Sequence, residues 1–111
     1  MNLGKIKFYD ADKKNLGYII IETKDKTVEK EIYFHGNSVL DNRFKLTEGK
    51  LVIFNITKKG KRQALNIKLY DSLSNEEKID LIPDLPIMRL RILTYELLAD
   101  TFNFTENQKK N

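Results

Sequence analysis

The stretch "EIYFH", residues 31–35, alternates between two kinds of side chain. In an extended chain Ile32 and Phe34 lie on one face, and Tyr33 and His35 lie on the other. The first face suits a hydrophobic core, whereas the second would carry rings at a surface. This alternation predicts a half-buried β-strand. His35, the only histidine of the chain, would then be part of an outer sheet face.

Further strand-like stretches lie on both sides of this segment. Residues 5–10 ("KIKFYD") and 16–22 ("LGYIIIE") are rich in β-branched and aromatic residues, with the polar turn "ADKKN" between them. Residues 50–70 ("KLVIFNITKKGKRQALNIKLY") predict a hairpin around "KKGKR", and the charged residues 23–30 ("TKDKTVEK") predict a connection. Five short strands without a helical period predict a mainly β fold, a small closed antiparallel barrel over about the first 70 residues.

Length and composition limit the classes of protein. A chain of 111 residues fits one domain, and 41% hydrophobic with 32% charged residues is typical of a globular protein without membrane spans. The N-terminal residues lack the pattern of a signal peptide, and the absence of cysteine excludes disulfides and thiolate metal sites. We therefore expect a cytoplasmic protein with no membrane partner.

The positive charge of the chain is concentrated in its first part. Residues 1–71 contain 15 Lys and Arg against 9 Asp and Glu, a net charge of +6, whereas residues 72–111 contain 5 against 7, a net charge of −2. A basic surface favours a polyanionic partner, because phosphate binding releases counterions. The alternative is a lysine-rich surface that is only solvated.

The first 70 residues resemble a cold-shock domain, the small OB-fold barrel of bacterial cold-shock and Y-box proteins. "GKIKFYDADKKNLGYI" is similar to the opening strand and first RNA-binding motif of that family, and "IYFHG" is similar to the second motif. "FKLTEGKLVIFNI" and "KGKRQALNI" resemble the closing strands. Four similar segments in the family's order make the resemblance specific. It implies a five-stranded antiparallel OB-fold barrel over residues 1–71 that binds single-stranded RNA or DNA.

The resemblance implies a set of contact residues on one face of this barrel. Exposed rings beside lysines are suited to stacking on unpaired bases. The expected stacking side chains are Phe8, Tyr18, Tyr33, His35 and Phe44, and the expected phosphate or base-edge contacts are Lys5, Lys7, Lys13 and Arg62. For Phe8 and Phe44 the alternative is that the rings pack against one another.

Four positions depart from the family pattern. Phe8 stands in place of the usual tryptophan, Leu16 and Gly36 in place of phenylalanines, and Asp10 in place of asparagine. Each missing stacking ring removes about 1–3 kcal/mol, so we expect weaker binding than in a typical family member. The turn at residues 11–16 is also longer than in the family.

The sequence does not indicate an enzyme or a metalloprotein. A catalytic triad could use only His35, whose strand neighbours are aromatic rather than acidic, and zinc needs several nitrogen or sulfur ligands. The glycines are dispersed, so no phosphate-binding loop is expected. We therefore expect no catalytic residues, no metal and no cofactor. The function indicated is single-stranded nucleic-acid binding of an RNA chaperone-like kind; the alternatives are a protein-interaction module with weakened nucleic-acid affinity and a dimeric regulator.

Residues 72–111 form a helical extension that a cold-shock domain does not need. "SLSNEEKIDLIP" predicts a short helix with Ser74 as N-cap, acidic residues in its first turn and Pro83 at its end. A second helix is predicted from about Pro86 to Phe102, because proline suits a first helical turn.

The second predicted helix carries more apolar surface than one neighbour can cover. On a helical wheel its polar residues form one narrow stripe, which comprises Arg89, Glu96, Asp100 and Asn103. Apolar residues fill most of the remaining circumference: Ile87, Met88, Leu90, Ile92, Leu93, Tyr95, Leu97, Leu98 and Phe102. We therefore expect residues 74–104 to form a homodimer contact; the alternative is a helix enclosed within its own chain.

Overall fold

The computed structural model describes residues 1–22, 31–57 and 60–109, and the side chains of the last helix as far as Ala99. Five strands form one antiparallel sheet: β1 (Asn2–Asp10), β2 (Leu16–Ile21), β3 (Glu31–His35), β4 (Leu51–Ile56) and β5 (Ala64–Leu69). Their order in the sheet is β3-β2-β1-β4-β5. The predicted strands are confirmed, whereas the connection at residues 23–30 and part of the "KKGKR" turn, residues 58 and 59, lie outside the described residues.

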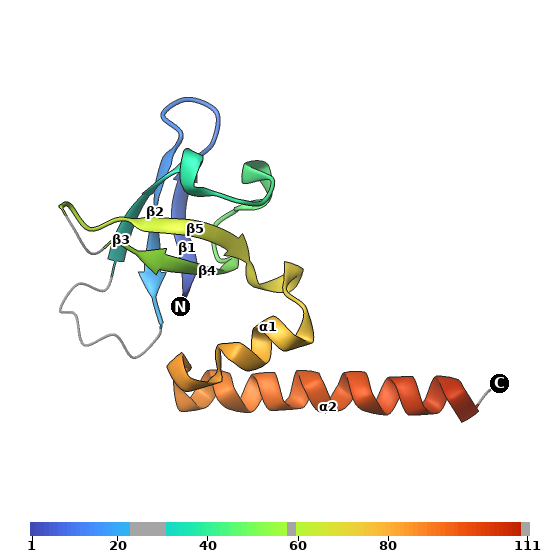
Figure 1. Ribbon diagram of the computed structural model, residues 1–111. Helices are drawn as coiled ribbons and strands as arrows, with labels where there is room; N and C mark the ends of the chain where they lie inside the picture. The colour runs from blue at the N-terminus through green and yellow to red at the C-terminus, as the bar shows by residue number, and fades with distance from the viewer. Residues whose placement is uncertain (23–30, 58–59, 110–111) are drawn as a thin grey trace.

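The sheet is strongly curled, so that its two edge strands approach each other (Figure 1). Isolated parallel bridges join Tyr33 of β3 to Gln63 just before β5, and Val39 after β3 to Ile67 of β5. The prediction of a mainly β fold with five antiparallel strands followed by helices is confirmed, and the strong curl of the sheet is consistent with a barrel-like fold.

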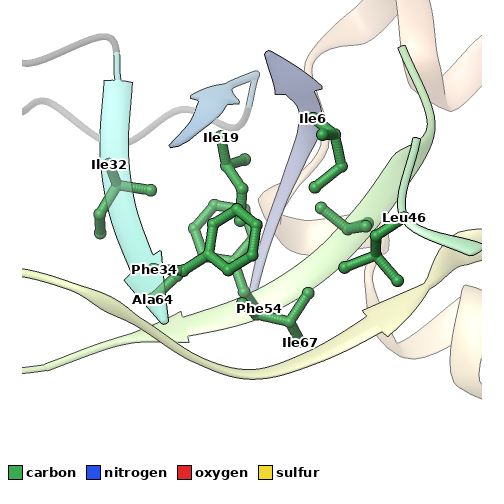
Figure 2. Close-up of a cluster of buried hydrophobic side chains, with 9 residues drawn as sticks. Ile6, Ile19, Ile32, Phe34, Leu46, Phe54, Ala64 and Ile67 are labelled. Carbon is green, nitrogen blue, oxygen red and sulfur yellow. The ribbon is translucent and has the colours of Figure 1, made fainter. Parts of the chain in front are cut away.

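The inside of the curl holds the main hydrophobic core (Figure 2). Ile6 of β1 lies opposite Ile19 of β2, which lies opposite Ile32 of β3. Directly opposed residues of antiparallel strands point to the same face, so this whole row points inward. The enclosed side chains of this core are Ile6, Ile19, Ile32, Phe34, Leu46, Val52, Phe54, Ala64 and Ile67. The burial of Ile32 and Phe34 confirms the inner face predicted for "EIYFH".

A β-bulge in β1 changes the alternation of its side chains. Ile6 and Phe8 pair with two consecutive residues of β2, so Lys7 has no opposite residue on that strand. As a result Lys7 and Phe8 both face outward. Tyr9 then returns to the inside, where its ring centroid lies 5.0 Å from that of Phe34.

Two helices follow the sheet. α1 (Asn75–Asp80) begins at Ser74, whose side chain accepts a hydrogen bond from the amide of Glu77 while the Glu77 carboxylate accepts one from the amide of Ser74. This capping box confirms the predicted helix start. α2 (Ile87–Lys109) ends later than the predicted Phe102, because no glycine or proline follows to stop it. Within the described ranges, neither helix has a segment long and apolar enough to span a membrane.

The helices cover the outer face of β1 and β4. Leu3 of β1 lies opposite Ile53 of β4, and both are buried among residues of the helical extension. This second cluster comprises Leu3, Ile53, Tyr70, Leu73, Leu81, Leu85 and Leu93. Farther along the same outer face the sheet is open, since Phe8, Tyr18 and Ile20 are exposed there.

Short 3-10 helices complete the described elements: Gly36–Ser38, Arg43–Lys45, Tyr70–Ser72 and Ile82–Asp84.

Two members of the polar stripe of α2, Arg89 and Glu96, bond to other elements of the chain. The guanidinium of Arg89 donates to both carboxylate oxygens of Glu22 at 2.6 and 3.0 Å, and this bond keeps the pKa of Arg89 above its ordinary value. Glu96 accepts a hydrogen bond from the hydroxyl of Tyr70 at 3.0 Å and pairs with Lys78 at 3.6 Å. Burial, together with the bond to Glu96, raises the pKa of Tyr70. The remaining members of the predicted stripe lie outside the described side chains: Asp100 and Asn103.

Candidate nucleic-acid interface

Three rings form a row across the outer face of the sheet. Phe8 of β1 lies opposite Tyr18 of β2, and Tyr18 lies opposite Tyr33 of β3. Opposed residues share a face, and this is the open outer face, because Phe8 is 51% and Tyr18 41% exposed. The rings of Tyr18 and Tyr33 meet edge to face, with centroids 6.0 Å apart. We refer to Phe8, Tyr18 and Tyr33 as the aromatic row.

Cationic side chains lie at the Tyr33 end of the aromatic row. The ammonium of Lys61 lies 6.0 Å from the centre of the Tyr33 ring, at the outer limit of a cation–π contact. The parallel bridge between Tyr33 and Gln63 holds the turn that contains Lys61 against β3. The result is a shallow hollow lined by Tyr18, Glu31, Ile32, Tyr33, Lys61 and Arg62. Rings for a base and cations for a phosphate are adjacent in this hollow.

His35 lies on the same outer face, one row farther along the strands. It lies opposite Leu16 of β2, where the family resemblance expects a ring. The histidine is half-buried, and its Nδ1 accepts a hydrogen bond from the amide of Asn37 at 3.1 Å. A neutral imidazole that accepts at Nδ1 carries its proton on Nε2. His35 therefore shares the outer face with Tyr33, as the alternation predicts, and presents a donor at Nε2.

The end of the β1–β2 turn packs tightly against Gly36. Asn15 has a left-handed backbone with a φ of 54°; its carbonyl accepts from the amide of Gly36 at 2.8 Å, and its side chain accepts from the Tyr9 hydroxyl at 2.6 Å. A Cβ at Gly36 would lie only 1.7 Å from Oδ1 of Asn15. The ring that the family carries at this position therefore has no space in this chain.

Lys13 lies in the same turn, at the end of the sheet where His35 is located. The Asp10 carboxylate accepts hydrogen bonds from the amides of Lys13 and Lys14 at 3.1 and 3.3 Å, and these bonds lower the pKa of Asp10. They fix the path of the turn. The side chain of Lys13 is exposed there, so it can reach a phosphate bound along the outer face.

Lys5 and Lys7 lie beside the aromatic row, but carboxylates engage both. Lys7 donates to Glu31, and the ammonium of Lys5 lies 3.8 Å from the carboxylate of Glu22. Both lysine side chains are about half exposed, so water screens these pairs and each is worth less than about 1 kcal/mol. A phosphate group can therefore replace either carboxylate at small cost.

Phe44 is exposed but does not belong to the strands that form the aromatic row. It belongs to the 3-10 helix Arg43–Lys45, and the guanidinium of Arg43 lies 5.1 Å from its ring centre. Strand pairing does not bring Phe44 into the row. Among the described residues neither Phe8 nor Phe44 forms a ring pair, so the alternative in which these two rings pack together is not observed.

The structure adds Lys61 and Glu31 to the expected contact residues. Lys61 comes from the "KKGKR" segment, and the bridge between Tyr33 and Gln63 brings it beside the Tyr33 ring. Glu31 could have been found from the sequence, because it shares the alternation that places Tyr33 and His35 on the outer face.

The candidate interface thus combines the aromatic row, His35 and a basic turn at one edge. Within the described part of the chain, no three His, Asp or Glu side chains gather into a cluster that could hold a metal ion. Comparison with known proteins adds no assignment: no protein-family model matches this chain, and no curated protein matches it.

Proposed function

We propose that this protein binds single-stranded nucleic acid on the outer face of β1, β2 and β3. The observation that carries the proposal is the aromatic row, in which the strand register sets three rings beside one another on an exposed surface. Every base has a π-face, and stacking on an aromatic side chain is worth about 1–3 kcal/mol per base. The neighbouring lysines supply contacts to phosphate.

The strand order and edge bridges support a cold-shock-like OB barrel as the scaffold. In OB folds the face of strands 2 and 3, together with the loops between strands 1 and 2 and between strands 4 and 5, binds oligonucleotides. In this chain that face carries Tyr18 and Tyr33, the first loop carries Lys13, and the second carries Lys61 and Arg62. Rings therefore lie on the strand face, and cations lie in the two loops, that such a barrel would use to bind an oligonucleotide.

Binding would act by competition with base pairing. A base stacked on Tyr18, Tyr33 or His35 is unavailable to a pairing partner, while lysine contacts follow the backbone with little regard for sequence. The protein would keep weakly structured RNA or DNA single-stranded, as an RNA chaperone does. This activity needs neither a nucleophile nor a cofactor.

The affinity of one domain is expected to be modest. Leu16 and Gly36 provide no ring, and Glu31 adds a carboxylate to the hollow beside Tyr33. A bound phosphate must also displace Glu31 from Lys7. These features weaken binding without removing the stacking surface.

Alanine substitutions test the stacking surface. Tyr18→Ala and Tyr33→Ala are each expected to weaken binding of a short oligopyrimidine by roughly 5- to 150-fold, and His35→Ala is expected to weaken it less, since the imidazole is smaller. Fluorescence anisotropy measures the affinity, and circular dichroism checks the fold. Tyr95→Ala is the matched control, because that ring is exposed on α2, away from the sheet. Unchanged affinity in all three folded variants would exclude this mode of binding.

A salt titration separates this function from the alternative of a protein-interaction module. If Lys5, Lys7, Lys13 and Arg62 contact phosphates of a single strand, the logarithm of the affinity should fall against the logarithm of salt concentration with a slope of about −3. Lys13→Ala should reduce that slope by about 0.7. A flat response would favour the protein-interaction module.

A further inference from the structure

α2 exposes an apolar face to solvent and turns polar side chains inward. Leu93 is buried, and Arg89 and Glu96 bond to the body of the protein, as described above. On the opposite side Tyr95 is 75% and Met88 69% exposed. We define the outer face of α2 as Ile87, Met88, Arg91, Ile92, Tyr95 and Leu98. This is the reverse of an ordinary surface helix, whose polar residues face water.

The outer face of α2 is accessible over about three turns of the helix. From Ile87 to Leu98 it spans about 17 Å. The C-terminal turns of the helix project beyond the sheet and α1 (Figure 1). A shallow groove along it is lined by Ile87, Leu90, Arg91, Thr94, Tyr95 and Leu98. An apolar surface of this extent on a protein marks an interaction site.

We propose that the outer face of α2 binds the same face of a second copy, with the two helices antiparallel. With a twofold axis level with Leu93, Arg91 of one copy lies opposite Tyr95 of the other, and Met88 lies opposite Leu98. Each guanidinium then meets an aromatic ring, which attracts cations, and aliphatic side chains meet aliphatic side chains. A twofold contact of this kind is self-complementary and closes after two copies.

The single charge on the outer face decides the orientation. In a parallel pair Arg91 would lie opposite Arg91 of the other copy, and the two like charges would repel across an apolar contact. In the antiparallel pair the same side chain finds Tyr95. The antiparallel arrangement is therefore the one that this face supports.

The charge of the outer face also favours a second copy over a membrane surface. Helices that lie on membranes carry several lysines or arginines on their polar face. Among the described side chains of α2, Arg91 is the only charged one on the outer face, and Arg89 of the polar stripe is bound to Glu22. The inference does not depend on nucleic-acid binding.

Sedimentation equilibrium of the full chain tests the interface. Wild type is expected to be a dimer at tens of micromolar, and Leu98→Glu is expected to raise the dissociation constant of the dimer roughly 30-fold or more. Leu40→Glu is the matched control, because Leu40 is 57% exposed but lies outside α2; it should leave the dimer intact. A monomeric wild type would overturn the proposal, and a monomer that sediments with anionic phospholipid vesicles would assign the face to lipid.

Disulfide trapping tests the orientation independently of Leu98→Glu. The chain has no cysteine, so Met88→Cys and Leu98→Cys each introduce a single thiol. In the antiparallel dimer two identical thiols lie about 15 Å apart along the helices, beyond the reach of a disulfide. Mixing the two variants is therefore expected to give a cross-linked dimer, whereas neither variant alone should. Cross-linking of each variant alone, or of no sample, would overturn the antiparallel pair.

Discussion

The aromatic row and the outer face of α2 are both apolar and exposed, but they are built differently. The aromatic row takes one ring from each of three strands, and backbone hydrogen bonds between the strands fix the spacing of the rings. Charged side chains of both signs surround it. The outer face of α2 is formed by consecutive turns of one helix, is largely aliphatic and includes one cation, Arg91.

The two proposals therefore assign different kinds of partner to the two surfaces. Rings with charged neighbours suit a ligand that is flat and anionic, because stacking and phosphate contacts can form together. Aliphatic side chains gain free energy only when water is excluded, so they need a partner of matching shape and polarity. Exposed apolar area therefore marks an interaction site, while the charges beside it indicate the class of ligand.

Adjacent residues of β3 give the strongest contrast between the aromatic row and the core. Phe34→Ala removes a fully enclosed ring and is expected to lower the free energy of unfolding by about 3–5 kcal/mol. Tyr33→Ala removes a ring from the outer face and is expected to lower it by less than about 1 kcal/mol. Urea unfolding measures both values. Similar losses of stability in the two variants would show that Tyr33 is a core residue rather than a binding residue.

Dimerisation would link the two surfaces, because one nucleic-acid strand could contact two aromatic rows. A strand long enough to reach both is expected to bind roughly 100-fold more tightly than a short strand. Leu98→Glu should remove this gain and leave the affinity for the short strand unchanged. A series of oligonucleotide lengths, measured with wild type and with L98E, gives the comparison. If the gain persists in monomeric L98E, it arises within one copy.

Arg89 lies on the inner face of α2 and Arg91 on its outer face, so substitutions of these two residues test the orientation of the helix. Arg89→Leu breaks the partly buried bond to Glu22 and is expected to lower the free energy of unfolding by about 1.5 kcal/mol. Arg91→Leu is expected to change it by less than about 0.5 kcal/mol. Both are measured by urea unfolding in the Leu98→Glu background, so that dimerisation does not contribute. A larger loss at Arg91 would contradict the orientation of α2.

Glu31→Gln is expected to have the smallest effect and to strengthen binding. It removes a negative charge from the hollow beside Tyr33 and releases Lys7, so the affinity for an oligonucleotide should rise roughly 2- to 5-fold at low salt. Glu76→Gln, at an exposed position on α1, changes the net charge equally and serves as control. Weaker binding of Glu31→Gln would indicate that the carboxylate accepts hydrogen bonds from a base.

Local sequence signals predicted most of the fold. The alternation in "EIYFH" predicted which side chains of β3 are buried, and Ser74 predicted the start of α1 because a capping box involves only four consecutive residues. The position of Tyr33 and His35 on the outer face follows from the same alternation. These features depend on neighbours in the sequence, so they can be predicted without a structure.

The orientation of α2 and the position of Lys61 could not be predicted from the sequence, because both depend on contacts between distant residues. Glu22 and Arg89 are 67 positions apart, and their bond holds Arg89 of the polar stripe beside the end of β2. The bridge between Tyr33 and Gln63 places Lys61 beside the aromatic row. Nothing in the local sequence of these residues indicates such partners, because the first contact depends on how α2 packs on the sheet and the second on the curl of the sheet.

Because of its bulge, β1 could lose one residue without reversing the direction of its side chains. A deletion within an ordinary strand reverses the facing of every residue beyond it. Removal of Lys7 would instead restore simple alternation, with Lys5 outward, Ile6 inward, Phe8 outward and Tyr9 inward. A homologue shorter by this one residue would keep its core and its aromatic row and would lose one positive charge. At this position, gain or loss of a residue would change the charge of the surface while the architecture stays the same.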